Sequence, residues 1–207
     1  ARHLVAQALV EADLDRSLLL AAQANRLDDS VDTRGALLTS LLRSPQAIGM
    51  LRGAGDRLLH LAVSPDGRIL AAGDEAGRTL LWDTSTRRPL PGPPQLPKLN
   101  GDQDPLQTLA FSSDSRLLLT AGFSTIHRWD LAAHQAAGSF DVLSISPEAG
   151  LSSMAVSRDG PRLAIATLGK VLWLDLATWR PAAAPLVVAN NSGLDRLALS
   201  ADGRVLA

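Results

Sequence analysis

The sequence predicts a mainly β structure in which about three four-stranded repeats and the start of a fourth follow a short α-helical segment. One pattern, beginning with leucine and ending with arginine, occurs four times, at residues 58–68, 106–116, 151–162 and 194–204. The alanine inside this pattern recurs at intervals of 48, 45 and 43 residues. Between the copies, short apolar runs alternate with turns rich in Gly, Pro and Asp. Because β-propeller blades repeat every roughly 40–50 residues, we expect a partial propeller.

The first part of the chain, residues 1–50, is expected to be a helical linker segment. Apolar residues recur at three- and four-residue spacing within 4–12, 14–27 and 31–42, which is typical of amphipathic helices. Ser30 suits the N-cap of the third helix, and Pro45 marks its exit. We expect the buried stripe of that helix to comprise Val31, Leu37, Leu38, Leu41 and Leu42. Local helix packing is the favoured interpretation of this stripe, and a docking surface for another domain is the alternative.

Residues 51–207 are expected to form the propeller fragment. In the first repeat a strand runs into the turn 64–67, where Pro presets φ and Gly accepts positive φ. Strands at 69–72 and 79–83 follow, and an outer strand near 88–90 tolerates proline. The later repeats follow the same plan, with strands at 109–112, 117–120, 126–130, 154–157, 163–166 and 171–175. The predicted blades cover residues 58–90, 106–140 and 151–186, and the next one starts at 194–207.

A family resemblance rests on the ends of the third strands. Trp82-Asp83 and Trp129-Asp130 close these strands, and the aspartates continue to Asp175 at intervals of 47 and 45 residues. With the Ser-Pro-Asp-Gly-like turns, these residues resemble the WD-repeat β-propeller family. The resemblance covers about residues 51–207. It implies four-stranded sheets packed radially around a channel, with each sheet covered on both faces.

The chain also departs from the family pattern. The usual Gly-His pair before the first strand is Gly53-Ala54, and the third repeat has Leu174-Asp175 in place of Trp-Asp. The buried histidine, serine, aspartate and tryptophan network of well-formed repeats is therefore not expected. Apolar contact between blades remains the main stabilising interaction, and we expect the individual blades to be less rigid.

The helical start resembles the helices that precede propellers in bacterial STAND proteins, which are multidomain signal-transduction ATPases. The resemblance rests on the Ala- and Leu-rich stretches 4–9, 15–24 and 33–42. It implies that a nucleotide-switch module lies upstream in a parent protein and that the propeller serves as a sensor or docking platform. That module is not in this chain.

Composition limits the cellular location and the classes of partner that we expect. The 207 residues are 46% hydrophobic, with 20 basic and 21 acidic side chains, so nothing in the bulk charge indicates nucleic acid or a membrane surface. Zero cysteines exclude disulfides and thiolate metal sites and fit a cytoplasmic protein. The longest wholly apolar run, 18–22, is too short to cross a bilayer. We expect no nucleic-acid or membrane partner.

Motifs that carry chemistry are weak. The Gly-Lys pair at Gly169-Lys170 is followed by Val171, which does not complete a phosphate-binding loop, and it is interpreted as a hairpin turn. The histidines lack paired metal spacing; they are His3, His60, His127 and His134. Asp102-Gln103-Asp104 is interpreted as a solvated turn. We therefore nominate no catalytic, cofactor-binding or metal residue, and no cofactor.

The sequence thus predicts a non-catalytic protein-interaction or sensor/scaffold region of a larger bacterial signalling protein. The candidate binding loops are Gly73–Gly77, Gly122–Thr125, Leu168–Lys170 and Pro91–Pro105. The last loop contains Pro94-x-x-Pro97, which is either a spacer between blades, the favoured interpretation, or a polyproline ligand.

Two other functions stay open. One is a hydrolase-like enzyme with ionisable residues around the channel, and the other is a structural spacer. Three and a fraction blades cannot close a ring, so the remaining blades of the parent chain are an expected partner. The isolated piece is expected to aggregate or to be marginally stable.

Overall fold

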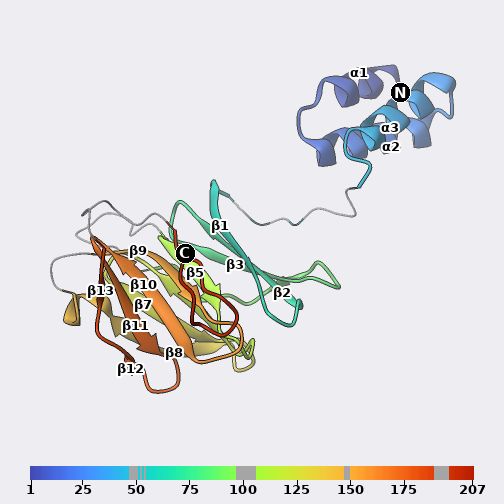
Figure 1. Cartoon of the computed structure of the whole chain (residues 1–207). Helices are drawn as coiled ribbons and strands as arrows, with labels where there is room; N and C mark the ends of the chain where they lie inside the picture. The colour runs from blue at the N-terminus through green and yellow to red at the C-terminus, as the bar shows by residue number, and fades with distance from the viewer. Residues whose placement is uncertain (47–50, 52, 54, 97–105, 147–149, 189–195) are drawn as a thin grey trace. The chain divides into compact units, whose positions relative to one another are not determined.

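The computed structural model describes residues 1–46, 51, 53, 55–96, 106–146, 150–188 and 196–207 (Figure 1). The chain divides into two compact units, Ala1–Met50 and Leu51–Ala207. The first unit is helical and the second consists of antiparallel sheets. Each unit is described by itself.

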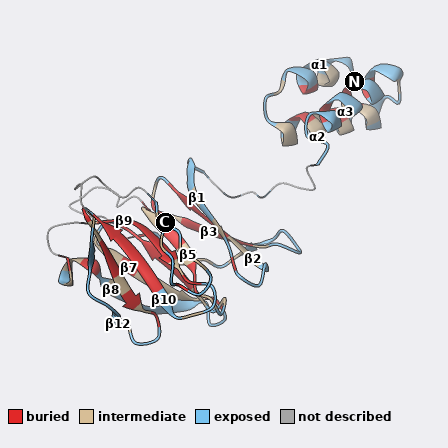
Figure 2. Cartoon of the chain, in the orientation of Figure 1, coloured by how far each residue is buried: buried red, intermediate tan, exposed pale blue. Residues whose placement is uncertain are grey.

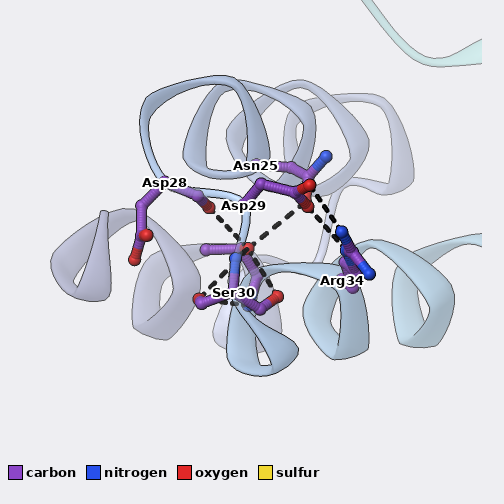
Figure 3. Close-up of polar contacts among 6 residues, drawn as sticks. Asn25, Asp28, Asp29, Ser30 and Arg34 are labelled. Atoms are coloured by element: carbon purple, nitrogen blue, oxygen red, sulfur yellow. Dashed lines mark hydrogen bonds and ion pairs between the residues drawn. The ribbon is translucent and has the colours of Figure 1, made fainter.

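The helical unit contains the three expected helices, α1 (Arg2–Val10), α2 (Leu14–Leu27) and α3 (Val31–Leu42). Ser30 caps α3 as predicted, because its hydroxyl accepts a hydrogen bond from the Thr33 N–H while the Thr33 hydroxyl accepts one from the Ser30 N–H. The Thr33 hydroxyl also lies 2.7 Å from the Asp28 carbonyl oxygen. Figure 3 shows this junction, beside which Arg34 forms an exposed ion pair with Asp29. None of the helices in the described part of the chain is long and apolar enough to cross a membrane.

The predicted buried stripe of α3 is wrong. Val31, Leu38, Leu41 and Leu42 are more than half exposed, and only Leu37 packs against the core of the unit. The buried side chains are small, and they comprise Ala8, Ser17, Ala21, Ala24, Thr33, Ala36 and Ser40. The Ser17 hydroxyl bridges two helices, since it lies 2.7 Å from the Ala8 carbonyl oxygen and 2.8 Å from the Ser40 hydroxyl. Small side chains allow close helix packing, which turns the leucines outward.

The second unit consists of three antiparallel sheets, as the repeats predict. The first sheet has the order β1 (Leu58–Val63), β2 (Ile69–Asp74), β3 (Thr79–Asp83) and β4 (Pro89–Leu90). The second has β5 (Thr108–Phe111), β6 (Leu117–Ala121), β7 (Thr125–Asp130) and β8 (Gln135–Asp141), followed by the 3-10 turn η1 (Val142–Ser144). The third has β9 (Leu151–Val156), β10 (Arg162–Thr167), β11 (Lys170–Asp175) and β12 (Arg180–Pro181), and β13 (Leu186–Val187) also pairs with β11. The predicted partial propeller of four-stranded blades is confirmed.

Apolar contact between the blades forms the core of this unit (Figure 2). A first inter-blade core joins blades one and two, and its buried members include Leu81, Leu109, Phe111 and Leu118. A second inter-blade core joins blades two and three, and its members include Leu119, Ile126, Met154, Leu163 and Ile165. Leu118 and Leu119 are neighbours on β6, both are 0% exposed, and they belong to different cores. Because successive side chains of a strand point to opposite faces, β6 is covered on both sides, and Thr120 is its one polar residue.

The repeated Ser-x-Asp segment, followed by Gly or, in the second copy, by Ser115, forms the turn between the first two strands of a blade. In the first blade the Ser64 hydroxyl donates to Asp66 Oδ1 at 2.6 Å and accepts from the Ile69 N–H at 2.9 Å. Ser112 and Ser200 repeat both contacts in the second and fourth copies. In the third copy, which is one residue longer, the Ser157 hydroxyl donates to the Gly160 carbonyl oxygen instead. The fourth copy thus has a formed turn, with a single bridge between Leu199 and Leu206 in place of strands.

The aspartates at the ends of the third strands organise the next turn. Asp83 accepts hydrogen bonds from the Ser85 and Thr86 N–H groups at 2.9 and 2.7 Å, and Asp130 and Asp175 make equivalent contacts. The preceding tryptophan of the second blade, Trp129, has a buried Nε1 without a hydrogen-bond partner among the described residues. In the described second blade, the Trp129 Nε1 therefore takes no part in a hydrogen-bond network.

Candidate interaction surface at the propeller axis

The pairing of the strands brings three of the predicted loops to one face. The first residue of each innermost strand pairs with the end of the second strand, in the pairs Leu58–Asp74, Thr108–Ala121 and Leu151–Thr167. The turns 73–77, 122–125 and 168–170 therefore lie at the same edge of their sheets as the starts of β1, β5 and β9. These innermost strands also contact one another from blade to blade. We call this edge the loop face.

A cavity of about 310 Å³ lies between the innermost strands at the loop face. Leucines and Met154 form part of its wall. Its polar lining comes from all four copies of the repeat and consists of His60, Gln107, Thr108, Ser152, Ser153 and Arg196. Four of these residues, from His60 to Arg196, stand two positions before the repeat alanine in their copies. We call this site the axial cavity.

Electrostatics in the axial cavity is set by His60 and Arg196, the ionisable residues of its lining. Burial of the His60 imidazole lowers its pKa, a hydrogen bond to the Leu106 backbone opposes this shift, and the Arg196 charge reinforces it. His60 is therefore neutral at pH 7, whereas Arg196 is exposed and charged. No carboxylate belongs to the lining as described, so the site has one fixed positive charge.

One serine of the third blade holds the fourth copy at this site. The Ser153 hydroxyl, which is buried, accepts a hydrogen bond from the Leu197 N–H at 3.1 Å. Ser152 lies beside it, and its hydroxyl donates to the Ala166 carbonyl oxygen at 3.3 Å. The contact to Leu197 fixes the main chain directly after Arg196, whose side chain lines the cavity.

The candidate loops differ in what they expose. In the turn 73–77, the buried Asp74 accepts hydrogen bonds from the Arg78 N–H and Nε, both at 2.8 Å, and Arg78 also pairs with Asp56. By contrast, Phe123 is 46% exposed and Leu168 is 51% exposed. The turn at 168–169 is a two-residue hairpin, because Thr167 pairs with Lys170 and Gly169 has a φ of 71°. The predicted hairpin turn is confirmed.

The proline-rich loop 91–105 is described only to residue 96. Its Leu96 is buried in the first inter-blade core and donates its N–H to the Gly77 carbonyl oxygen at 3.1 Å. These contacts are those of a spacer packed between blades. Pro97 and Asp102-Gln103-Asp104 lie outside the described residues.

The sequence predictions missed the axial cavity. The available signal was the polar residue two positions before each repeat alanine, at 60, 108, 153 and 196. Side chains alternate between the two sides of a strand, so this spacing on the first strand of each blade could have placed these residues near the axis. Within the described ranges no three His, Cys, Asp or Glu residues gather as a group that could hold a metal ion.

Comparisons with known proteins agree with this geometry. Residues 45–83 match the family model described as WD domain, G-beta repeat. A search of curated protein sequences found no match.

Three solved structures resemble the fold. The structure of U3-55K is 20% identical with a TM-score of 0.59, and the match covers 72% of this chain and 45% of that chain. The crystal structure of RRP9 WD40 repeats is 19% identical with a TM-score of 0.57, covering 72% and 44%. A mitotic checkpoint complex is 22% identical with a TM-score of 0.59, covering 77% and 49%. The chain therefore spans less than half the length of each of these structures, and at such identities the likeness concerns the fold.

The sheet order, the repeated turns and these similarities converge on one architecture. Propellers of this kind are scaffolds for protein interaction and are usually non-catalytic. The second unit of this chain is a WD40-like partial β-propeller.

Proposed function

We propose that this chain is a non-catalytic interaction region of a larger bacterial signalling protein and that it binds a protein partner through the loop face. The observation that carries the proposal is the combination on one face of a polar axial cavity with the exposed side chains of Phe123 and Leu168. Exposed aromatic and aliphatic anchors around a polar site are typical of protein-binding surfaces. The anchors come from different blades, so the partner would contact a composite surface.

The wider context of the proposal comes from the resemblance of the first unit to the helices of STAND proteins. In that setting a nucleotide-switch module precedes the helical linker in the cytoplasm, and the remaining blades of the parent complete the ring. The propeller then acts as the sensor or docking platform, and the switch module supplies the chemistry.

Site-specific photo-cross-linking in the intact parent protein tests the proposal. A photoreactive amino acid at position 123 or 168 is expected to capture a protein partner in cells. Ala133 and Ala177 are matched controls, since both are exposed in the turns that follow the third strands, at the opposite edge of the sheets. They should capture none.

Two results would contradict the proposal. Equal capture from both edges would show that partner binding is not specific to the loop face. Absence of capture from either edge would favour the structural spacer. As an independent check, deletion of the propeller from the parent should remove partners from affinity pull-downs. An unchanged set of partners would overturn the interaction role.

A further inference from the structure

We infer that the axial cavity binds an oxyanion carried by an acidic segment of the partner protein, a carboxylate or a phosphate. The inference rests on the proposed function and adds the chemistry that the site selects. Three observations carry it, namely the free donors in the lining, the sign of the local charge and the size of the cavity.

Arg196 provides the principal donor. Its guanidinium forms no hydrogen bond or ion pair with any residue in the described ranges, although ion pairs occupy Arg34, Arg78 and Arg204. The main chain at Arg196 is held in place, because the next residue donates its N–H to Ser153. A guanidinium presents five N–H donors in a planar fork that matches the two oxygens of a carboxylate or a phosphate.

Additional donors lie on the second blade. Gln107 and Thr108 line the same cavity and are half-buried, and their side chains make no hydrogen bond with the described part of the chain. The hydrogen bond that Gln107 donates comes from its backbone N–H, which lies 2.8 Å from the Ala121 carbonyl oxygen. An amide and a hydroxyl left without partners in a recess favour a ligand that brings acceptors.

The local charge selects the sign of the ligand. Arg196 acts on the interior of the cavity, because its charge contributes to the lowered pKa of His60. The lining contains no carboxylate among its described residues, so a cationic ligand would meet repulsion without compensation. An anion would be attracted, and it would also favour the protonated form of His60, which adds a second positive charge.

The size of the cavity limits the ligand to a side chain. About 310 Å³ lies at the lower end of the range for small-molecule sites. A glutamate, aspartate or phosphorylated serine side chain with its hydration fits this volume, while the peptide backbone rests on the surrounding loops. The partner is therefore expected to present a protruding acidic segment.

A nuclear magnetic resonance titration of the full chain, at a concentration where size-exclusion chromatography shows it to be monomeric, provides a site-specific test. The probes are three short peptides that differ at one central residue, which is glutamate, phosphoserine or the isosteric glutamine. The imidazole signals of His60, assigned with His60→Gln, should shift with the glutamate and phosphoserine peptides and stay in place with the glutamine peptide. The stronger of the two acidic peptides identifies the source of the oxyanion.

Arg196→Gln should weaken binding of the acidic peptide roughly five- to tenfold, because one charge-assisted donor pair is lost. Arg204→Gln is the matched control, since Arg204 is an exposed arginine of the same repeat outside the cavity lining, and it should leave affinity unchanged. Equal shifts with the glutamine peptide, or equal affinity of the Arg196→Gln variant, would overturn the inference. Complete absence of binding by the acidic peptides would do the same. Cross-linking through Phe123 and Leu168 would still decide the proposed function separately.

Discussion

At the scale of single residues, the repeated serine of each first turn satisfies groups that would otherwise be buried without partners. Ser64 is 3% exposed, and its hydroxyl serves both Asp66 and the N–H of Ile69. The same contact lowers the pKa of Asp66, because the Ser64 hydroxyl donates to its ionised form. The serine therefore couples the turn to the start of β2.

Replacement of this serine should destabilise the strand unit. Ser64→Ala leaves the Ile69 N–H without its acceptor, so we expect a loss of about 1–2 kcal/mol in the free energy of unfolding. The pKa of Asp66 should rise toward its usual value. Urea denaturation and a carboxyl titration measure the two effects. Ser113→Ala is the control, since the Ser113 hydroxyl makes no hydrogen bond with the described residues; equal losses for both variants would contradict the role given to Ser64.

Asp83 gives a prediction of pH dependence. Hydrogen bonds from the Ser85 hydroxyl and from the N–H and hydroxyl of Thr86 lower the pKa of Asp83 from 3.8 to about 2. A lowered pKa in the folded state means that the contribution of Asp83 is present above pH 3.8 and disappears as the pH falls toward 2.

The free energy of unfolding of Asp83→Asn should therefore depend less steeply on pH across this window than that of the unmodified chain. Urea midpoints measured at a series of pH values give the two slopes. Asp159→Asn is the control, because the Asp159 carboxylate accepts no hydrogen bond within the described ranges. A slope for Asp83→Asn that equals that of the parent chain would show that this carboxylate does not contribute.

At the scale of elements, the helical unit depends on small residues where the helices meet and carries an exposed glycine within α3. Gly35 lies within α3 and is exposed, and a Cβ added there would meet nothing within 4 Å. Gly35→Ala should stabilise the helix by about 0.5–1 kcal/mol, because alanine loses less backbone entropy than glycine on folding. Thermal unfolding followed by helical circular dichroism provides the measurement. A lower melting temperature would indicate that the position is covered in solution.

A glycine at the boundary between blades should respond in the opposite direction. A Cβ on Gly73, near the end of β2, would lie 1.8 Å from Leu106 Cδ2, and Leu106 is 1% exposed in the first inter-blade core. Gly73→Ala should therefore destabilise the sheets by about 1–3 kcal/mol through overpacking. Leu106→Ala makes room for the added Cβ. Gly73→Ala should therefore cost less stability in the Leu106→Ala variant than in the unmodified chain. Additive losses would contradict direct contact as the cause.

The same elements show how far the sequence could be interpreted. Strands were predictable because each blade repeats the same apolar runs and turns, so that several copies support one assignment. The outward rotation of Leu38 and Leu41 in α3 was not, because periodicity locates an apolar face but does not show whether small residues beside it pack more closely. The axial cavity was missed because its polar residues are isolated in sequence, and only the pairing of separate copies brings them together.

At the scale of the whole molecule, the first blade has one uncovered face. Leu61 and Val63 on β1 are 65% and 57% exposed, whereas the residues at the same repeat positions on β5, Leu109 and Phe111, are 7% and 6% exposed. The second blade is covered because it packs on the first in the first inter-blade core. The face of β1 is thus an inter-blade surface without its counterpart in the described chain.

This open face should dominate the behaviour of the chain in solution. Exposed β-strand faces with high apolar content promote association, so the chain is expected to aggregate or to unfold with low stability. The double variant Leu61→Thr/Val63→Thr retains β propensity and removes apolar surface, so it should elute closer to monomer size and bind less hydrophobic dye.

Leu109→Thr is the contrasting variant, because the equivalent side chain is buried between two blades. It should cost about 2–4 kcal/mol of stability and increase association, since it damages the first inter-blade core and leaves the open face unchanged. Light scattering after size-exclusion chromatography and urea denaturation separate the two responses. If the unmodified chain were monomeric with a sharp, reversible unfolding transition, the exposed β1 face would not cause association, and this prediction would be wrong.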